Sequence, residues 1–115
     1  MFLSSSNQVQ RSGLFALGNI CYGSKRNTAA LGTLRAWEPV LKAMTAFPHS
    51  EGVQENGALA LANMAFSNAA NKEAMGTMDL LNALLSAMAG FPRSEGIPPP
   101  SLSLSLLFPL DFAVS

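Results

Sequence analysis

The sequence predicts an all-α fold in which short helices stack as the repeats of a solenoid. The first observation is an internal repeat: when the chain is shifted by 44 residues, positions 9–52 align with positions 53–96 without a gap. The second is that apolar residues recur at helical spacing within each unit. The third is the period, because repeats of about 40–47 residues are typical of stacked short helices. We therefore expect one repeat segment, residues 1–96, and a separate tail, residues 97–115.

Residue identity supports the repeat at 18 of the 44 aligned positions. Several differences are conservative, such as Ile20 against Met64 and Val40 against Leu84. Drift within a low-complexity sequence does not produce ungapped agreement over a whole unit. The identical positions, each matched by the same residue 44 later, are Val9, Gln10, Gly13, Ala16, Leu17, Asn19, Asn27, Ala30, Gly32, Thr33, Leu41, Ala43, Met44, Phe47, Pro48, Ser50, Glu51 and Gly52.

Each unit begins with a helix, predicted over about residues 7–22 in the first unit. Its apolar residues fall on one face, which we expect to be buried. A glycine within that face destabilises a helix by about 1 kcal/mol relative to alanine, so its recurrence indicates close approach of a neighbouring helix. Ser50 is expected to cap the second of these helices. The two stripes are Val9, Gly13, Ala16, Leu17 and Ile20, and Val53, Gly57, Ala60, Leu61 and Met64.

Two further helices complete each unit. A short one is predicted over residues 25–31 and 69–75, followed by Gly32 and Gly76, where a left-handed C-terminal residue is expected. A longer one is predicted over about residues 34–47 and 78–91. Pro39 is compatible only with the first turn of a helix, so that helix is expected to start late or to kink. The apolar stripes of the longer helices are Leu34, Trp37, Leu41 and Met44, and Met78, Leu81, Leu85 and Met88.

These patterns resemble the armadillo repeat. The family pattern is roughly V-Q-x-x-A-x-x-A-L-x-N-L-A, a polar loop, N-x-x-x-I-x-x-x-G and an apolar helix. The resemblance covers residues 7–96, with HEAT repeats as the alternative. In the family's order of helices, the chain starts with a third helix, continues with one full repeat, and ends with two helices of another. The matching residues are Val9-Gln10, Ala16-Leu17, Asn19, Asn27 and Gly32, and Val53-Gln54, Ala60-Leu61, Asn63, Asn71 and Gly76.

The resemblance implies a right-handed superhelix whose third helices line a concave groove that binds partner proteins or peptides. In importin-like members an Asn of the groove helix holds the peptide backbone, and a Trp four residues earlier packs against the peptide. Here the Asn positions match at Asn19 and Asn63, whereas Phe15 and Leu59 stand at the Trp positions. This difference argues against recognition of basic nuclear-import signals.

Helical spacing places Arg11 and Phe15 on the same face as Asn19, and Glu55 and Leu59 on the same face as Asn63. One hypothesis is that these six residues form the partner-facing strip. The alternative is that each asparagine side chain bonds backbone between helices, a structural role of about 1 kcal/mol.

Composition argues against catalysis and against several classes of ligand. Net charge is zero, which argues against a general nucleic-acid or anionic-membrane binder. The one cysteine, Cys21, and the one histidine, His49, do not form a metal site, and we interpret them as a core thiol and a solvated loop residue. No nucleophile motif or phosphate loop is present. We therefore expect no enzyme activity, no cofactor and no metal.

The tail departs from the repeat at Pro98, where Gln54 stands in the preceding unit. Three consecutive prolines exclude a helix, and Asp111 is the only charged residue from Ile97 to Ser115. We expect this segment to be disordered. It is either a linker or cap, or non-native coding such as read-through past an exon end, which we favour. A short array also predicts self-association through exposed repeat faces.

The sequence thus predicts a non-catalytic scaffold, a fragment of a longer protein, that binds a protein or peptide partner in the cytoplasm or nucleus. An alternative is the regulatory armadillo array of a larger enzyme, such as a kinase or ubiquitin ligase. A nuclear-transport adaptor is less favoured, because the flanking tryptophans are missing.

Overall fold

A computed structural model describes residues 2–91 of the chain, and for residues 2–6 it describes the backbone alone. This part of the chain is helical, with no strand in it. None of its helices combines the length and apolar character that a membrane crossing requires. The helices are α1 (Phe2–Cys21), α2 (Lys25–Thr33), α3 (Trp37–Ala46), α4 (Glu51–Ala65), α5 (Ala69–Met75) and α6 (Met78–Gly90).

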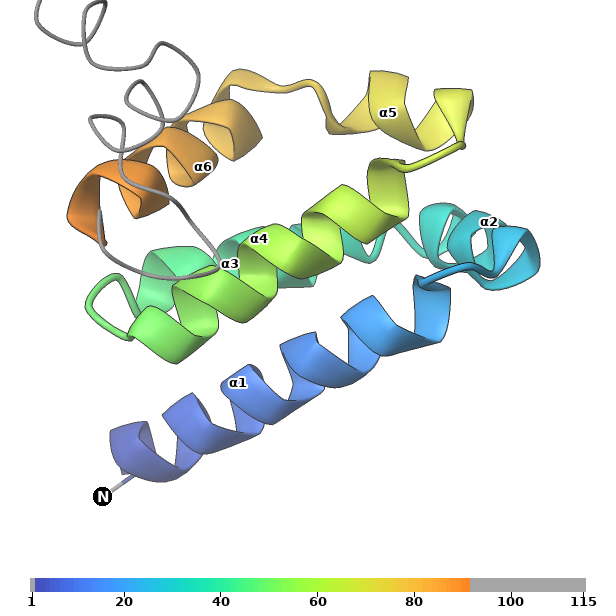
Figure 1. The fold of residues 1–115 in the computed structure, drawn as a ribbon. Helices are drawn as coiled ribbons and strands as arrows, with labels where there is room; N and C mark the ends of the chain where they lie inside the picture. The colour runs from blue at the N-terminus through green and yellow to red at the C-terminus, as the bar shows by residue number, and fades with distance from the viewer. Residues whose placement is uncertain (1, 92–115) are drawn as a thin grey trace, which may run out of the picture.

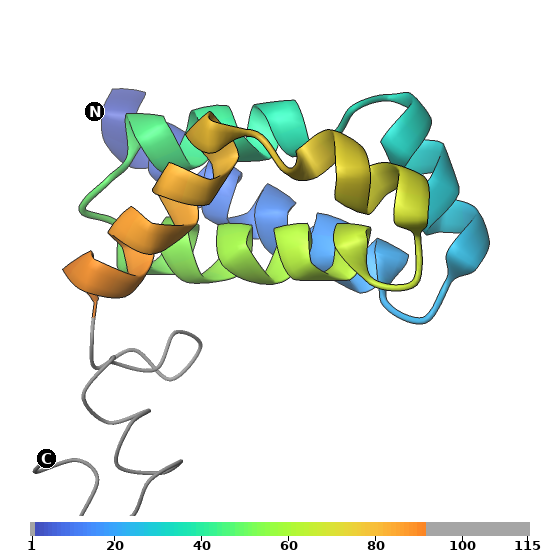
Figure 2. The same cartoon turned by 90° about the horizontal axis from the view of Figure 1, so that it is seen from above.

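The helices stack in two successive groups of three, α1–α3 and α4–α6. Figure 1 shows α1 and α4 lying side by side and running in the same direction, with α3 behind α4. In the view from above, α6 crosses the array beside α3 and α4, while α2 and α5 lie together at the opposite end (Figure 2). The all-α class predicted from the repeat is confirmed.

Capping residues set the starts of the helices. The side-chain oxygen of Ser24 accepts a hydrogen bond from the backbone N–H of Asn27, at the start of α2. Ser50 does the same for Val53 at the start of α4, as predicted. Asn68 and Thr77 cap α5 and α6. Such caps satisfy backbone donors that the first turn of a helix leaves unpaired.

The core lies between α3 and α4, with contributions from α1 and α6. Val53, Ala60 and Met64 of α4 are fully buried, as is Val40 of α3. The stripe predicted for the second unit is therefore confirmed. The buried apolar residues are Leu14, Cys21, Ala36, Trp37, Val40, Ala43, Met44, Val53, Ala60, Leu61, Met64, Met75, Leu80 and Ala87.

The corresponding stripe of the first unit is not buried, which corrects the prediction. Val9 is 64% exposed and Ile20 is 50% exposed, whereas their counterparts on α4 are fully buried. The reason is the order of the helices: α3 precedes α4 and covers its stripe, and residues 2–91 hold no helix that covers α1 in the same way. Gly13 accordingly has open space around its side-chain position.

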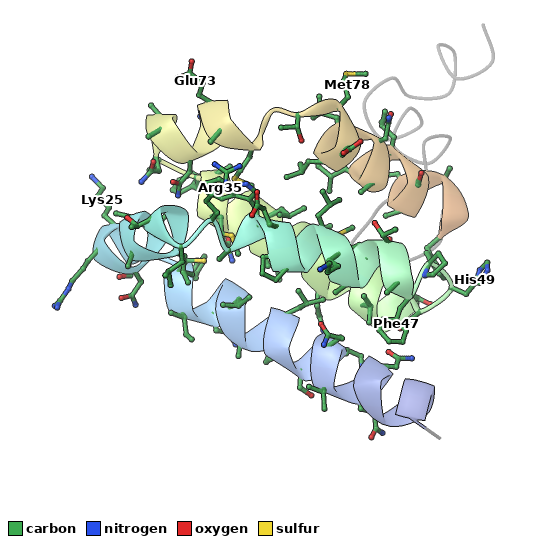
Figure 3. All side chains as sticks on the ribbon, turned by 180° about the vertical axis from the view of Figure 1, so that it is seen from behind. Lys25, Arg35, Phe47, His49, Glu73 and Met78 are labelled. Carbon is green, nitrogen blue, oxygen red and sulfur yellow. The ribbon has the colours of Figure 1, made fainter. Side chains whose placement is uncertain are left out.

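The apolar stripe predicted for α6 is also exposed. Met78 and Leu85 of α6 are 71% and 61% exposed, and Figure 3 shows Met78 pointing away from the other helices. Leu34, expected in the stripe of the first long helix, lies instead between α2 and α3 and is exposed. The reason is that α3 starts only at Trp37, which places Pro39 in its first turn, as one of the two predicted possibilities.

The predicted left-handed glycines are wrong. Gly32 lies inside α2, and Gly76 has a φ of −78°. The left-handed residue after α2 is Arg35, with a φ of 52°. Gly32 is required for a different reason: a side chain there would collide with the amide of Asn71 from the next repeat.

The two equivalent glycines of α1 and α4 are predicted to respond differently to substitution. A Cβ on Gly57 would lie 2.7 Å from Met44 Cγ, so Gly57→Leu overpacks the core and should lower the free energy of unfolding by about 2 kcal/mol. Gly13→Leu should leave stability unchanged or raise it by up to about 1 kcal/mol, because leucine is the better helix former. Urea denaturation at low protein concentration measures both, and equal destabilisation would contradict the packing described.

Candidate partner-binding strip

The six predicted strip residues come from α1 and α4. The structure brings the two helices together, because the aliphatic stem of Arg11 lies against Gly52 of α4 and the backbone oxygen of Arg11 accepts from Asn56 Nδ2 at 3.1 Å. Figure 1 shows α1 and α4 side by side and running in the same direction. Because the predicted faces hold equivalent positions on these two helices, we infer that they lie on the same side of the pair. We call this surface the strip: Arg11, Phe15, Asn19, Glu55, Leu59 and Asn63.

The strip is apolar at its centre. Phe15 is 55% exposed and Leu59 is 49% exposed. Asn19 is also exposed, whereas Glu55 and Asn63 are half-buried. Large apolar side chains exposed next to one another on neighbouring helices are a feature of binding surfaces.

The two asparagines of the strip differ in their environment. Asn63 Nδ2 donates to the backbone oxygen of Gly18 at 2.9 Å, which ties α4 to α1. Asn19 is exposed, and its amide takes part in none of the side-chain hydrogen bonds found among residues 7–91. The structural role considered for these residues therefore applies to Asn63, while the Asn19 amide remains open to a ligand.

Charge on the strip is balanced and sparse. Arg11 and Glu55 are its only ionisable members, and the described residues contain no ion pair between them. The ion pair found among the described residues joins Arg35, in the segment between α2 and α3, to Glu38 in the first turn of α3, at 2.9 Å. Arg35 also lies 5.4 Å from the ring centre of Trp37, the first residue of α3. The strip therefore offers one positive and one negative side chain, and its other four members are uncharged.

A hollow of about 450 Å³ lies apart from the strip centre, at the C-terminal ends of α1 and α4. Cys21, Thr28 and Phe66 form part of its wall. Burial raises the pKa of the Cys21 thiol, an effect that hydrogen bonding to the backbone partly offsets. The Sγ of Cys21 donates to the Leu17 oxygen at 3.1 Å, so the thiol is a structural core group, as the sequence predicts.

The described part of the chain holds no group of three His, Cys, Asp or Glu side chains that would hold a metal ion. His49 lies in the exposed loop between α3 and α4, where Figure 3 shows it projecting outward.

Two buried amides, Gln54 and Asn71, match the repeat pattern in the sequence but were given no structural role there. Gln54 Nε2 donates to the backbone oxygens of Met44 and Phe47, at 2.8 and 3.1 Å. Asn71 Nδ2 donates to the oxygens of Thr28 and Met64, at 3.0 and 2.9 Å. The signal for both was present, because each is a polar residue that is identical in the two units.

Removal of the two strip asparagines should have unequal effects on stability. Asn63→Ala removes the bond to Gly18 and should lower the free energy of unfolding by about 1 kcal/mol. Asn19→Ala should change it by no more than about 0.5 kcal/mol, as for other exposed residues. Chemical denaturation of the two variants compares them directly, and an Asn19→Ala loss as large as that of Asn63→Ala would refute the assignment.

The buried thiol gives a pH-dependent prediction. Because the pKa of Cys21 is higher in the folded chain than in the unfolded one, the unfolded state loses its proton first as pH rises. Stability should fall as pH rises through the unfolded value of about 8.5, and alkylation of the folded thiol should be slow until denaturant is added. Rapid modification of the folded chain by iodoacetamide at that pH would contradict its burial.

In comparisons with known proteins, no family model, curated protein or solved structure matches the chain.

Proposed function

We propose that the chain is a non-catalytic interaction module of the armadillo-repeat type, which binds an extended segment of a partner protein along the strip. The observation that carries the proposal is the exposure of Phe15 and Leu59 beside Asn19 on two parallel, hydrogen-bonded helices. The repeat order α1–α3 and α4–α6 and the family pattern in the sequence support the armadillo assignment.

The chemistry of the strip favours a particular class of peptide. The Asn19 amide offers both a donor and an acceptor, which suits the backbone of an extended chain. Phe15 and Leu59 offer apolar contact to the side chains that alternate along it. With Glu55 as the strip's only carboxylate, half-buried and offset by Arg11, we expect apolar peptides to bind better than basic ones.

A random-peptide library selected on the full chain tests this proposal, with affinities measured by fluorescence anisotropy. The enriched peptides should be uncharged and rich in apolar residues, and Phe15→Glu with Leu59→Glu should weaken their binding at least about tenfold. Leu34→Glu is the matched control, because Leu34 is an exposed leucine outside the strip. Equal weakening by the control, or enrichment of basic peptides only, would reject the proposal.

A further inference from the structure

The C-terminal side of the array has an apolar hollow of about 350 Å³ between α4, α5 and α6. Ala58 and Ala62 of α4, Met75 of α5 and Leu84 of α6 form part of its wall, and Lys72 is the one charged residue that lines it. These residues lie where a helix equivalent to α4 would pack against α4–α6, as α4 packs against α1–α3.

The equivalent hollow of the first group of helices is filled. Each residue that lines the open hollow has a counterpart 44 positions earlier, and every one of these counterparts is buried or half-buried. Leu14 and Cys21 of α1, Trp37 and Val40 of α3, and Thr28 of α2 are among them. The helix that covers them is α4, which contacts α1, α2 and α3. The residues that line the open hollow therefore correspond to those that α4 covers in the first group, so the hollow should accept a helix like α4.

The chain has such a helix at its other end. α1 is the counterpart of α4 and carries the corresponding apolar stripe, which is buried on α4 but on α1 is exposed at every position except the half-buried Leu17. No residue of the stripe is charged. The same molecule thus presents both halves of an interface that it already forms internally, one half at each end of the array.

The fit extends to single side chains. Inside the chain, Met44 lies in the notch left by Gly57. At the two ends, Gly13 provides the same notch, with no atom within 4 Å of its Cβ position, and Met88 provides the same methionine on an exposed face of α6.

The hydrogen-bonding groups are also duplicated. Gln54 donates to the oxygens of Met44 and Phe47 at the end of α3. Gln10 holds the same position on α1 and is half-buried, and Phe91 ends α6 as Phe47 ends α3. The φ and ψ angles are −124° and 63° at Phe47, and −132° and 64° at Phe91, so the two helix ends present their carbonyl groups in the same way.

We propose that copies of this chain assemble head to tail, with α1 of one copy seated in the α4–α5–α6 hollow of another. In this pairing Gly13 faces Met88, and Gln10 donates to the backbone oxygens of Met88 and Phe91. The interface joins two different surfaces and repeats the stacking of α4 on the first group of helices, so copies should add end to end and the assembly should grow with concentration instead of stopping at a dimer. The proposal is independent of peptide binding on the strip.

Sedimentation velocity of the full chain over a wide range of concentration tests the assembly. We expect a series of increasing species. Gly13→Leu fills the notch on α1. Ala62→Arg fills the hollow, because Ala62 is the counterpart of Gly18, and a Cβ added to Gly18 would already lie 3.6 Å from Asn63 Nδ2 and 3.7 Å from Ala60 Cα of α4. Each change is at an exposed position, so the monomer should keep its helical content, and each should raise the dissociation constant of self-association at least about tenfold.

Mixing the two variants separates head-to-tail pairing from other modes. The Gly13→Leu chain keeps an intact hollow and the Ala62→Arg chain keeps an intact α1 stripe, so the mixture should form a complex of one copy of each and stop there. If two α1 stripes paired with each other instead, Ala62→Arg alone would still associate, and the proposal would be overturned.

Gly90→Leu is the matched control, because Gly90 is an exposed glycine with open space around it, on the face of α6 opposite its stripe. This variant should assemble as the original chain does. Val9→Lys is a second variant of the α1 stripe, at an exposed position. It should also lose assembly, which would show that the effect of Gly13→Leu does not come from misfolding. An original chain that stays monomeric at all concentrations, or a mixture that forms no complex, would refute head-to-tail assembly.

Discussion

The packing of α4 is the constraint on which the rest of the structure depends. This helix contacts α1, α2, α3, α5 and α6, and its apolar stripe is fully buried at Val53, Ala60 and Met64. Helices of this length are marginal in water when isolated, so their stability comes from tertiary packing. The neighbouring helices depend on their contacts with α4 in turn. α2 and α5 are too short to be stable alone, and α1 buries only the side that faces α4 and α2.

Buried amides add geometric precision to that apolar packing. Gln54 binds the carbonyl groups at the end of α3, and Asn71 bridges α2 of one unit to α4 and α5 of the next. Burial of a polar amide is tolerated when its hydrogen bonds are made, and an unmade bond is expensive. These contacts therefore fix how far each helix lies from its neighbours, while the apolar stripe supplies the burial. The need for Gly32 beside Asn71 follows from the same close approach.

The surfaces that α4 leaves open divide into two kinds. The strip is open at Phe15, Asn19 and Leu59, whose side chains are exposed, although Asn63 bonds to α1. The stripe of α1 and the hollow beside α6 are open because they are the two halves of an interface that requires an adjacent unit. We propose an extended peptide as the ligand of the first kind of surface, and a helix of this same repeat as the occupant of the second.

The sequence by itself determined the repeat, the helical class and the position of Ser50 as a cap, because each depends on local spacing. It did not predict that Val9 and Ile20 would be exposed, since identical stripes imply identical burial only when both have a neighbouring helix. It likewise assigned Gly32 to a helix end, whereas contact with Asn71, 39 residues further along the chain, is what requires it. Burial and close approach are properties of pairs of helices, so only the tertiary structure decided which copy of each repeated residue is covered.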